Sequence, residues 1–475
     1  MTGSGAGARA PGAWPALWAG FTVLLVATGV NFAFGILFKP ILGELGVDRS
    51  TLALAATASL LVNAGGQPLF GALIDRLGPR RVVLASMALM TVGTGLVGRV
   101  DRAWQFVALY GIVAAIGYTG CGILSVAVHV SRWFPGERGF VTAVAASGFS
   151  LGHLVFTQVA AHAAAALGWR RTYGVLTVVL AVTLVALVGW LRDAPAAAAP
   201  GPTTLPGGGP ATTPTGASTP RTGGSAATVP AGGPAPAPAA RRPRDGAAPR
   251  LDAPPAASLD RRAALATGGF WAMTAGLMGC GFTDFLLTTH LAPHATDLGL
   301  GTAVAANAVS LWAAANVVGI LAGGSLATRL GARRTLVLTY AVRAAALFYL
   351  PLVREAWQLY VFAALFGATF FTTAPLSSTL VGDLFGPAHH GAIFGAANLF
   401  HHTAGALGSY AGGLVFDLTG SYRPIFLAGA LIVVGSAVVT SLARPPGRPA
   451  PSGRAGAADP RPAPRHPAGG PGTAS

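Results

Sequence analysis

Apolar segments long enough to cross a lipid bilayer recur along most of this chain of 475 residues. A transmembrane helix needs about 20 mainly apolar residues, and inside a bilayer only helices and closed barrels satisfy every backbone hydrogen bond. The sequence therefore predicts an all-α membrane protein with twelve transmembrane helices. The twelve segments that meet or approach the required length are 13–38, 51–74, 82–98, 104–128, 139–167, 172–191, 263–289, 302–327, 335–353, 357–381, 391–416 and 422–442.

The balance of residue types favours the lipid bilayer, and not nucleic acid, as the surrounding partner. Charged residues make up 10% of the chain and hydrophobic residues 52%, whereas a soluble domain carries about a quarter charged residues. The 31 basic residues outnumber the 15 acidic ones, but most arginines lie at the ends of apolar segments or in Pro/Ala/Gly-rich flanks. Cys121 and Cys280 each lie in an apolar segment, so neither a disulfide framework nor a cysteine metal site is expected.

The long polar stretch between the sixth and seventh segments divides the chain. It is rich in Pro, Ala, Gly and Thr, as is the C-terminal tail, so we expect both to be disordered. Short inner and outer loops hold eight basic residues each, and the arginines near the span ends (192, 261, 262, 444 and 448) place both termini in the cytoplasm. An arginine-rich chain with one lysine suggests a bacterial inner membrane. The predicted parts are a tail (1–12), a six-helix half (13–192), a cytoplasmic linker (193–262), a second six-helix half (263–442) and a tail (443–475).

An internal repeat relates the two predicted halves at an offset of 251–253 residues. The stretch 71–81 (GALIDRLGPRR) recurs as 324–334 (GSLATRLGARR), and 103–105 (AWQ) recurs as 356–358. Phe134 matches Phe385, and Gly168 before the sixth span matches Gly420 before the twelfth. Parallel six-helix repeats joined by a long linker are typical of a transporter that binds its solute near mid-membrane between halves that rock against each other.

The repeated stretch carries a signature of a known family. Its pattern is Gly, three residues, Asp, a basic residue, one residue, Gly, one residue and two basic residues. On these residues the chain resembles the major facilitator superfamily over the whole of 13–442. The first copy matches at Gly71, Asp75, Arg76, Gly78, Arg80 and Arg81, and the second keeps Gly324, Arg329, Gly331, Arg333 and Arg334 but has Thr328 in place of the acid.

Within that superfamily the chain is similar to the monocarboxylate and oxalate/formate transporter group. The resemblance implies a small organic anion as solute, often moved with a proton. Two departures affect that implication. The Asp and Arg that animal members carry in the eighth span align with Asn316 and Ile320, and apolar residues around Phe32 replace a lysine of the first span. The similar stretches are 34–40 (FGILFKP), 132–135 (RWFP), 168–170 (GWR), 383–387 (DLFGP) and 417–422 (DLTGSY).

The signature acid has a mechanical interpretation. Asp75 at the inner end of one helix can pair with Arg76 or Arg80 and accept hydrogen bonds from a neighbouring helix N-terminus, which would hold the halves in one access state. The alternative is a cluster that sets membrane topology and has no gating role.

Ionisable side chains within spans are functional candidates, because a charge at the bilayer centre costs roughly 2.5–3.5 kcal/mol. Asp284, with Thr288 one turn on, is either a protonatable coupling site or an acid that caps a helix or forms a salt bridge near the outer surface. Arg343 in the ninth span either contacts the solute or forms a structural pair, which its place on an outer-ring helix favours.

Histidines of the eleventh span are further candidates. His401 and His402 lie near its middle, with Asn398 one turn before His402. An imidazole there could bind an anion or relay a proton, or it could be neutral and bonded between helices. Adjacent residues point about 100° apart, so at most one of the two faces a cavity squarely. His153 in the fifth span is a candidate of the same kind, and Asn31, Tyr118 and Asn316 could line the route or join helices.

These features predict a secondary transporter of a small organic anion, with or without a coupled proton. No phosphate-binding loop, cofactor motif, metal-binding spacing or reactive constellation is visible, so we expect neither ATP, a cofactor, a metal nor an enzyme activity. Two alternatives remain. One is a drug or metabolite efflux antiporter, if Asp284 meets a cationic solute. The other is a membrane sensor that keeps the fold without transporting, although neither the linker nor the tail resembles a folded signalling domain.

Overall fold

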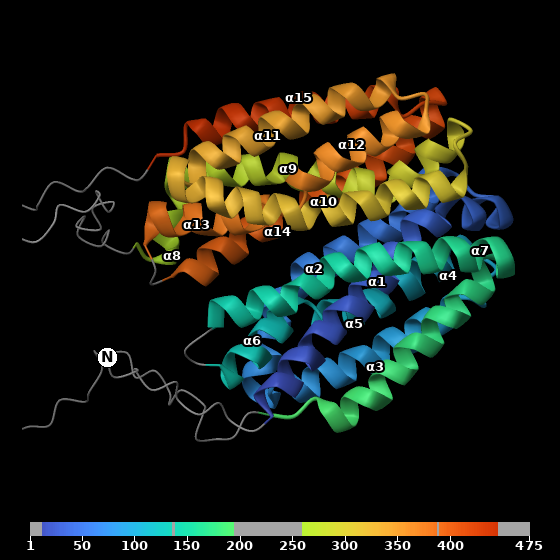
Figure 1. The fold of residues 1–475 in the computed structure, drawn as a ribbon, viewed down its shortest axis with the longest axis horizontal. Coiled ribbons are helices and arrows are strands. Elements are labelled where there is room, and N and C mark those ends of the chain that lie inside the picture. Colours follow the sequence, from blue (N-terminus) through green and yellow to red (C-terminus); the bar gives the residue numbers. More distant parts are fainter. Residues whose placement is uncertain (1–11, 135–137, 194–258, 387–388, 445–475) are drawn as a thin grey trace, which may run out of the picture.

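The computed structural model describes residues 12–134, 138–193, 259–386 and 389–444. These residues are helical, contain no strand, and form one elongated bundle (Figure 1). Within them, nine helices are long and apolar enough to cross a membrane. Each of the twelve segments expected from the sequence is helical, which confirms the predicted fold class. The predicted tails lie almost wholly, and the predicted linker mostly, outside the described residues.

The N-terminal half accounts for the first six predicted spans. The fourth span is interrupted, because α5 ends at Gly120 and α6 begins at Ile123. The fifth and sixth spans are two helices joined at Gly168, whose backbone is not helical (φ 78°), and both carry the label α7. The elements are α1 (Ala13–Leu45), α2 (Arg49–Leu77), α3 (Pro79–Val97), α4 (Ala103–Ala108), a π-helical turn (Leu109–Ala114), α5 (Ala115–Gly120), α6 (Ile123–Trp133) and α7 (Arg138–Trp190).

The C-terminal half repeats this arrangement. A short helix, α8 (Arg261–Leu265), starts at the end of the predicted linker, where the Asp260 side chain accepts a hydrogen bond from the backbone N–H of Ala263. The other elements are α9 (Gly268–Asp297), α10 (Gly301–Leu330), α11 (Ala332–Tyr349), a 3-10 turn (Leu350–Leu352), α12 (Ala356–Thr369), α13 (Thr373–Phe385), α14 (His390–Thr419) and α15 (Arg423–Ser441).

Repeated residues occupy equivalent positions in the two halves. Gln105 and Gln358 each accept hydrogen bonds from the two backbone N–H groups that precede α4 and α12. Gly168 and Gly420 both have positive φ, 78° and 69°, a conformation that side chains with a Cβ disfavour. The repeat seen in the sequence therefore preserves helix starts and tight turns.

The two halves pack against each other through three pairs of helices. α1 lies on α9, α2 on α14, and α7 on α10. Each half has an apolar core, and that of the C-terminal half also includes Phe32, Ile36 and Ala161 of the other half. We call the end of the bundle at which α3 and α11 begin the linker end, because the described chain also stops there at Asp193 and Arg444 (toward the left of Figure 1). The opposite end, at which α1 ends and α2 begins, is the far end.

Candidate functional site

The tenth predicted span is broken at its middle. α12 ends at Thr369 and α13 begins at Thr373, so carbonyl groups before the break lose their helical partners. Arg343 of α11 replaces those partners. Its side chain is fully buried, and its Nη2 donates to the carbonyl oxygens of Thr369 and Phe370, the second at 3.0 Å. Because an unpaired carbonyl within a membrane is costly, Arg343 stabilises the break.

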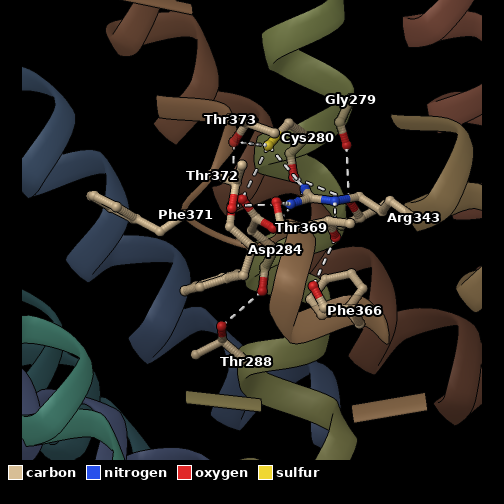
Figure 2. Close-up of polar contacts among 12 residues, drawn as sticks. Gly279, Cys280, Asp284, Thr288, Arg343, Phe366, Thr369, Phe371, Thr372 and Thr373 are labelled. Atoms are coloured by element: carbon tan, nitrogen blue, oxygen red, sulfur yellow. Dashed lines mark hydrogen bonds and ion pairs between the residues drawn. The ribbon is translucent and has the colours of Figure 1, made fainter. Parts of the chain in front are cut away.

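Asp284 of α9 neutralises this guanidinium. Nη1 of Arg343 donates to Oδ1 of Asp284 at 2.7 Å, and Asp284 is only 4% exposed. Nη1 also donates to Sγ of Cys280 at 2.9 Å, and this thiol donates to Oδ2 of Asp284 at 3.2 Å. Figure 2 shows these three side chains beside the break, with Nε of Arg343 directed to the Thr369 hydroxyl at 3.2 Å. The site is a buried, neutral and fully hydrogen-bonded ion pair.

The pair joins two residues that the sequence analysis treated separately. Asp284 and Arg343 are 59 positions apart, and Asp284 lies at the middle of α9, away from the far end where a salt bridge was one expectation. In this conformation all guanidinium nitrogens of Arg343 donate to protein atoms. The geometry agrees with the structural pair that was expected for Arg343, and the solute does not reach it without a rearrangement.

His401 of α14 is the third ionisable group at this place. Cys280, Asp284 and His401 each bring one ligand atom within 4.8 Å of the others, a grouping that the sequence spacing did not reveal. The Arg343 guanidinium already bonds two of the three, so a metal cation would meet its positive charge at short range. We therefore assign no metal to the grouping. His401 is half-buried, and its Nδ1 lies 3.0 Å from the carbonyl oxygen of Leu277.

His402 and Asn398 lie on the same helix but outside the cluster. Nδ1 of His402 lies 3.0 Å from the backbone carbonyl of Asn398, and both residues are half-buried. Phe285 contacts both imidazoles, with ring centroids 5.9 Å from His401 and 5.7 Å from His402. Of the two histidines, His401 therefore is the one beside Asp284.

Asn316 of α10 connects the break to the other half of the protein. Its Oδ1 accepts a hydrogen bond from the backbone N–H of Phe371 at 2.9 Å, inside the break, and its Nδ2 donates to the Ser150 hydroxyl of α7 at 3.0 Å. Asn316 is 2% exposed. At the position where the resembling group has an acid, this chain thus has an amide that links α12, α13 and α7.

The N-terminal half has no equivalent ion pair among its described residues. Met90 of α3 stands at the position that Arg343 occupies in α11, and the backbone of Gly117 packs closely on Met90. The two polar candidates here contact the protein: the backbone carbonyl of Asn31 accepts from the Tyr110 hydroxyl at 2.9 Å, and Tyr118 forms a hydrogen bond with Thr28. The interruption of the fourth span is therefore packed by small residues.

The signature residues of the linker end have visible structural roles. Gly78 and Gly331 turn the chain between helices with φ of 83° and 81°. Arg80 donates to the carbonyl oxygen of Leu191 at 2.6 Å, and Arg333 donates to that of Ala443 at 2.8 Å, so each arginine caps the last helix of its half. Asp75 is exposed and forms no ion pair with another described residue in this conformation. The pairing with Arg76 or Arg80 that we expected is absent from it.

The far end holds a cluster that the sequence analysis missed. Asp297, at the end of α9, binds two cations of the N-terminal half: Lys39 at 2.7 Å and Arg49 at 2.6 Å. Arg49 also lies over the ring of Phe416, 3.5 Å from its centroid, and donates to the Tyr422 hydroxyl at 2.7 Å. We call these five residues the far-end latch, because every one of the contacts joins the two halves.

A helix cap strengthens the same junction. The Asp417 carboxylate of α14 accepts hydrogen bonds from the backbone N–H groups of Arg49 and Ser50, at 3.1 and 2.8 Å. These are the first residues of α2, so an acid of one half caps a helix of the other. A sequence signal existed: the loop predicted to be the first outer one is basic at Lys39 and Arg49, whereas Asp297 ends the equivalent helix of the second half.

The fold and the repeat define a membrane transporter of two related helical halves. The family model of the Major Facilitator Superfamily matches residues 20–306 and 273–470, which together cover most of the chain. The chain belongs to the Major Facilitator Superfamily, as its signature predicted, and is a multi-pass membrane protein.

Individual relatives agree with this assignment. The chain is 23% identical over 436 residues to an uncharacterised MFS-type transporter, YcxA, of Bacillus subtilis (88% of this chain, 92% of the relative). It is 23% identical over 432 residues to monocarboxylate transporter 13 of Rattus norvegicus (90% and 88%). A shorter match, 32% over 136 residues, is to the oxalate:formate antiporter of Oxalobacter formigenes (28% and 32%). These similarities confirm the resemblance to the monocarboxylate and oxalate/formate group.

Solved structures share the fold. A bacterial homologue of the human lysosomal transporter Spinster, in an inward-facing and occupied conformation, superposes with a TM-score of 0.66 at 13% identity. The match covers 90% of this chain and 96% of that one. At this identity the likeness supports the arrangement of helices alone.

Proposed function

We propose that this transporter moves a small organic anion together with a proton by alternating access. The observation that carries the proposal is the buried Asp284–Arg343 pair at the break between α12 and α13. Ionisable residues within a membrane are costly, and those that persist are concentrated on solute and proton pathways.

The charge of the pair explains how a proton and an anion would depend on each other. With Asp284 ionised the pair is neutral. Protonation of Asp284 leaves the positive charge of Arg343 without its partner, and an uncompensated buried charge is strongly unfavourable. A solute carboxylate close to Arg343 restores neutrality. Proton and anion therefore each favour the binding of the other, which is the reciprocal coupling that symport requires.

A proton can reach Asp284 through a short series of groups. The titratable groups that face Asp284 are Cys280 of its own helix, Tyr340 and Arg343 of α11, and His401 of α14. Among these, His401 is the half-buried one. Since its Nδ1 is directed to the Leu277 carbonyl, its other ring nitrogen can exchange a proton between water on its exposed side and the Asp284 carboxylate.

An organic anion is the solute class best supported by the relatives. Two of those matched are named for carboxylates, as monocarboxylate transporter 13 and as an oxalate:formate antiporter. The eighth span of this chain lacks the acid and the arginine of animal members. An acid and an arginine are instead present on α9 and α11, as Asp284 and Arg343. An efflux antiporter for cations is less favoured, since Asp284 already has a cationic partner.

The membrane arrangement follows from the same proposal. We place the chain in a bacterial inner membrane with the linker end, both termini and the linker in the cytoplasm, because arginines near the span ends gather there. In this orientation the far-end latch closes the outer side. The halves are taken to be 13–192 and 263–442.

Transport in proteoliposomes tests the proposal. Uptake of a panel of labelled carboxylates, measured with and without a pH gradient, should show one or more solutes whose uptake increases when the outside is acidic. Asp284→Asn keeps the shape of the side chain but cannot exchange a proton, so the effect of the gradient should disappear. Asp101→Asn, which changes an exposed acid of the far end, is the matched control.

Unchanged dependence on the gradient in Asp284→Asn would contradict proton coupling through this pair and leave a uniporter or an uncoupled exchanger. No uptake of any carboxylate by a well-inserted protein would instead favour the membrane sensor or a transporter of another solute class.

A further inference from the structure

Aromatic side chains of both halves meet at the middle of the interface. From the N-terminal half, the ring of His153 stacks on Phe32 of α1 with centroids 4.2 Å apart. From the C-terminal half, Trp312 of α10 contacts His153 at 5.6 Å. Phe371, inside the break of the tenth span, contacts Phe149 of α7 at 5.0 Å, and Figure 2 shows its ring extending from the break toward the N-terminal half.

Two polar groups within this cluster lack hydrogen-bond partners. The indole N–H of Trp312 is buried and has no partner among the described residues, although the side chain is only 1% exposed. The imidazole of His153, 3% exposed, makes ring contacts but no side-chain hydrogen bond with any of them. Buried polar groups in folded proteins are nearly always paired, and an unpaired one needs a specific explanation. Here two come from opposite halves and touch.

The cluster adjoins the charged pair through one residue. The Phe370 ring lies 4.8 Å from that of Trp312 and 6.5 Å from that of His153, while the Phe370 carbonyl accepts a hydrogen bond from Arg343. A negative charge among these rings therefore lies within range of the guanidinium in a medium of low dielectric constant, where charges interact strongly.

A groove between the halves lies on the helices that carry part of this cluster. It has a volume of about 300 Å³ and is lined by α1, α7 and α10. Its wall includes Ser150, next to Phe149 in the chain, and Ala313, next to Trp312. The groove therefore borders the helices that carry His153 and Trp312, and we expect a separation of α7 from α10 to connect it with the aromatic cluster.

We propose that His153 and Trp312 bind the carboxylate of a monoanion whose flat apolar body packs among Phe32, Phe149 and Phe371. The inference rests on the proposed function and specifies its solute. Ligand sites combine apolar and aromatic walls with a few polar groups that fix orientation, and this cluster has both. The indole N–H donates one hydrogen bond to the carboxylate, and the imidazole N–H donates a second.

The charge count selects the monoanion. One proton on Asp284 leaves one positive charge on Arg343, which compensates one carboxylate. A dianion such as oxalate brings a second charge with no compensation and no apolar body to contact the rings. A monoanion without an apolar body, such as acetate, forms the hydrogen bonds but loses the contact area. An arylcarboxylate has the single negative charge, the carboxylate that accepts both hydrogen bonds and the apolar body that contacts the rings.

Equilibrium binding of labelled benzoate to the purified full-length protein in detergent at mildly acidic pH tests the site. We expect saturable binding that unlabelled benzoate displaces, with acetate and oxalate at least about tenfold weaker as competitors. Trp312→Phe and His153→Gln each remove or displace a hydrogen bond and should each weaken binding about tenfold. Trp357→Phe and His162→Gln change exposed residues of the same types and should bind as the unchanged protein does.

The two substitutions are independent, so if one variant does not fold the other still decides. Wild-type affinity in either well-folded variant, equal competition by oxalate, or no benzoate binding would each overturn the proposal. Because detergent removes any gradient, the result is separate from the coupling test. Benzoate binding with gradient-independent uptake would keep the site and reject the coupling through Asp284.

Discussion

The two ends of the interface between the halves are held together in different ways. At the far end, Asp297 bonds Lys39 and Arg49, and Asp417 caps the first turn of α2 across the interface. At the linker end, the signature residue Asp75 is exposed and has no ion pair among the described residues. Charged groups are thus present at both ends, but among the residues that the structure describes, only those of the far end connect the halves.

This difference indicates which contacts must exchange during transport. A transporter that alternates between two access states must break the bonds of one end and form bonds at the other, with a small net free-energy change. We therefore propose that the far-end latch stabilises the conformation seen here and that Asp75 stabilises the opposite one. The signature arginines Arg80 and Arg333 cap helices within their own halves, so their hydrogen bonds do not depend on contact between the halves.

The largest expected effect comes from the centre of the far-end latch. Asp297→Asn removes the charge that Lys39 and Arg49 share and leaves Arg49, whose side chain is 11% exposed, without its main partner. Loss of one partner from a largely buried charge pair costs about 2 kcal/mol, or a roughly 30-fold change in the population ratio. Spin labels at Leu77→Cys and Leu330→Cys should move closer together as the linker end closes.

Asp101→Asn is the control for this measurement, because Asp101 contacts Arg170 within the N-terminal half. An unchanged label distance in Asp297→Asn would show that packing, and not the ion pairs, holds the far end closed.

The second substitution should shift the population of the two access states in the opposite direction. Asp75→Asn removes a charge that forms no ion pair with the described residues in the present conformation, so we expect that conformation to gain population and transport to slow about tenfold, with membrane insertion intact. Combining Asp75→Asn with Asp297→Asn should bring the label distance back toward that of the unchanged protein. Normal transport in Asp75→Asn would contradict a gating role for Asp75 and leave it with a topogenic role.

A smaller effect is expected from the helix cap. Asp417→Ala leaves two backbone N–H groups of α2 without their acceptor, and loss of a helix cap costs about 1 kcal/mol, or a roughly fivefold shift in the same equilibrium. Asp417→Asn retains an acceptor oxygen and should lie between the Ala variant and the unchanged protein. The distance between the spin labels at the linker end measures the effect of both variants. Equal distances in Asp417→Ala and the unchanged protein would show that the cap does not help to hold the far end closed.

The smallest effect should come from the predicted linker. Its Pro/Ala/Gly-rich composition predicts a disordered chain. We therefore expect that shortening it by half changes transport by less than about twofold, since a disordered chain of the remaining length would still span the linker end. Uptake in proteoliposomes checks this. A large loss in a well-inserted protein would show that the linker binds a partner or affects the closing of this end.

Several features of the fold could be predicted from the sequence because they are local. Hydropathy over about 20 residues identified the spans, since transfer into lipid depends on each segment's own side chains. The repeat located equivalent turns, and positive φ explains why Gly78 and Gly331 recur in the signature. The breaks in the fourth and tenth spans were not predicted, because an interrupted span keeps the same apolar composition.

The candidate site could be predicted only in part. Asp284, Arg343 and His401 were selected because ionisable residues within spans are rare, but nothing in the sequence indicated that the first two form a pair or that His401 lies beside them. Nothing in the sequence indicated a functional role for Trp312, because a tryptophan within an apolar span is common. Its unpaired N–H became visible only when its neighbours were known.

The sequence by itself thus determined the membrane class, the two-half repeat, the family and the set of charged residues inside the bilayer. The tertiary structure decided which of those charges neutralise each other and which end of the interface is closed. Hydropathy and turn preference act over one helix or one turn, whereas a hydrogen bond of 2.7 Å between Arg343 and Asp284 depends on the rotation and packing of α9 and α11. The same holds at the far end, where Arg49 and Asp297, 248 positions apart, meet only because the two halves close there.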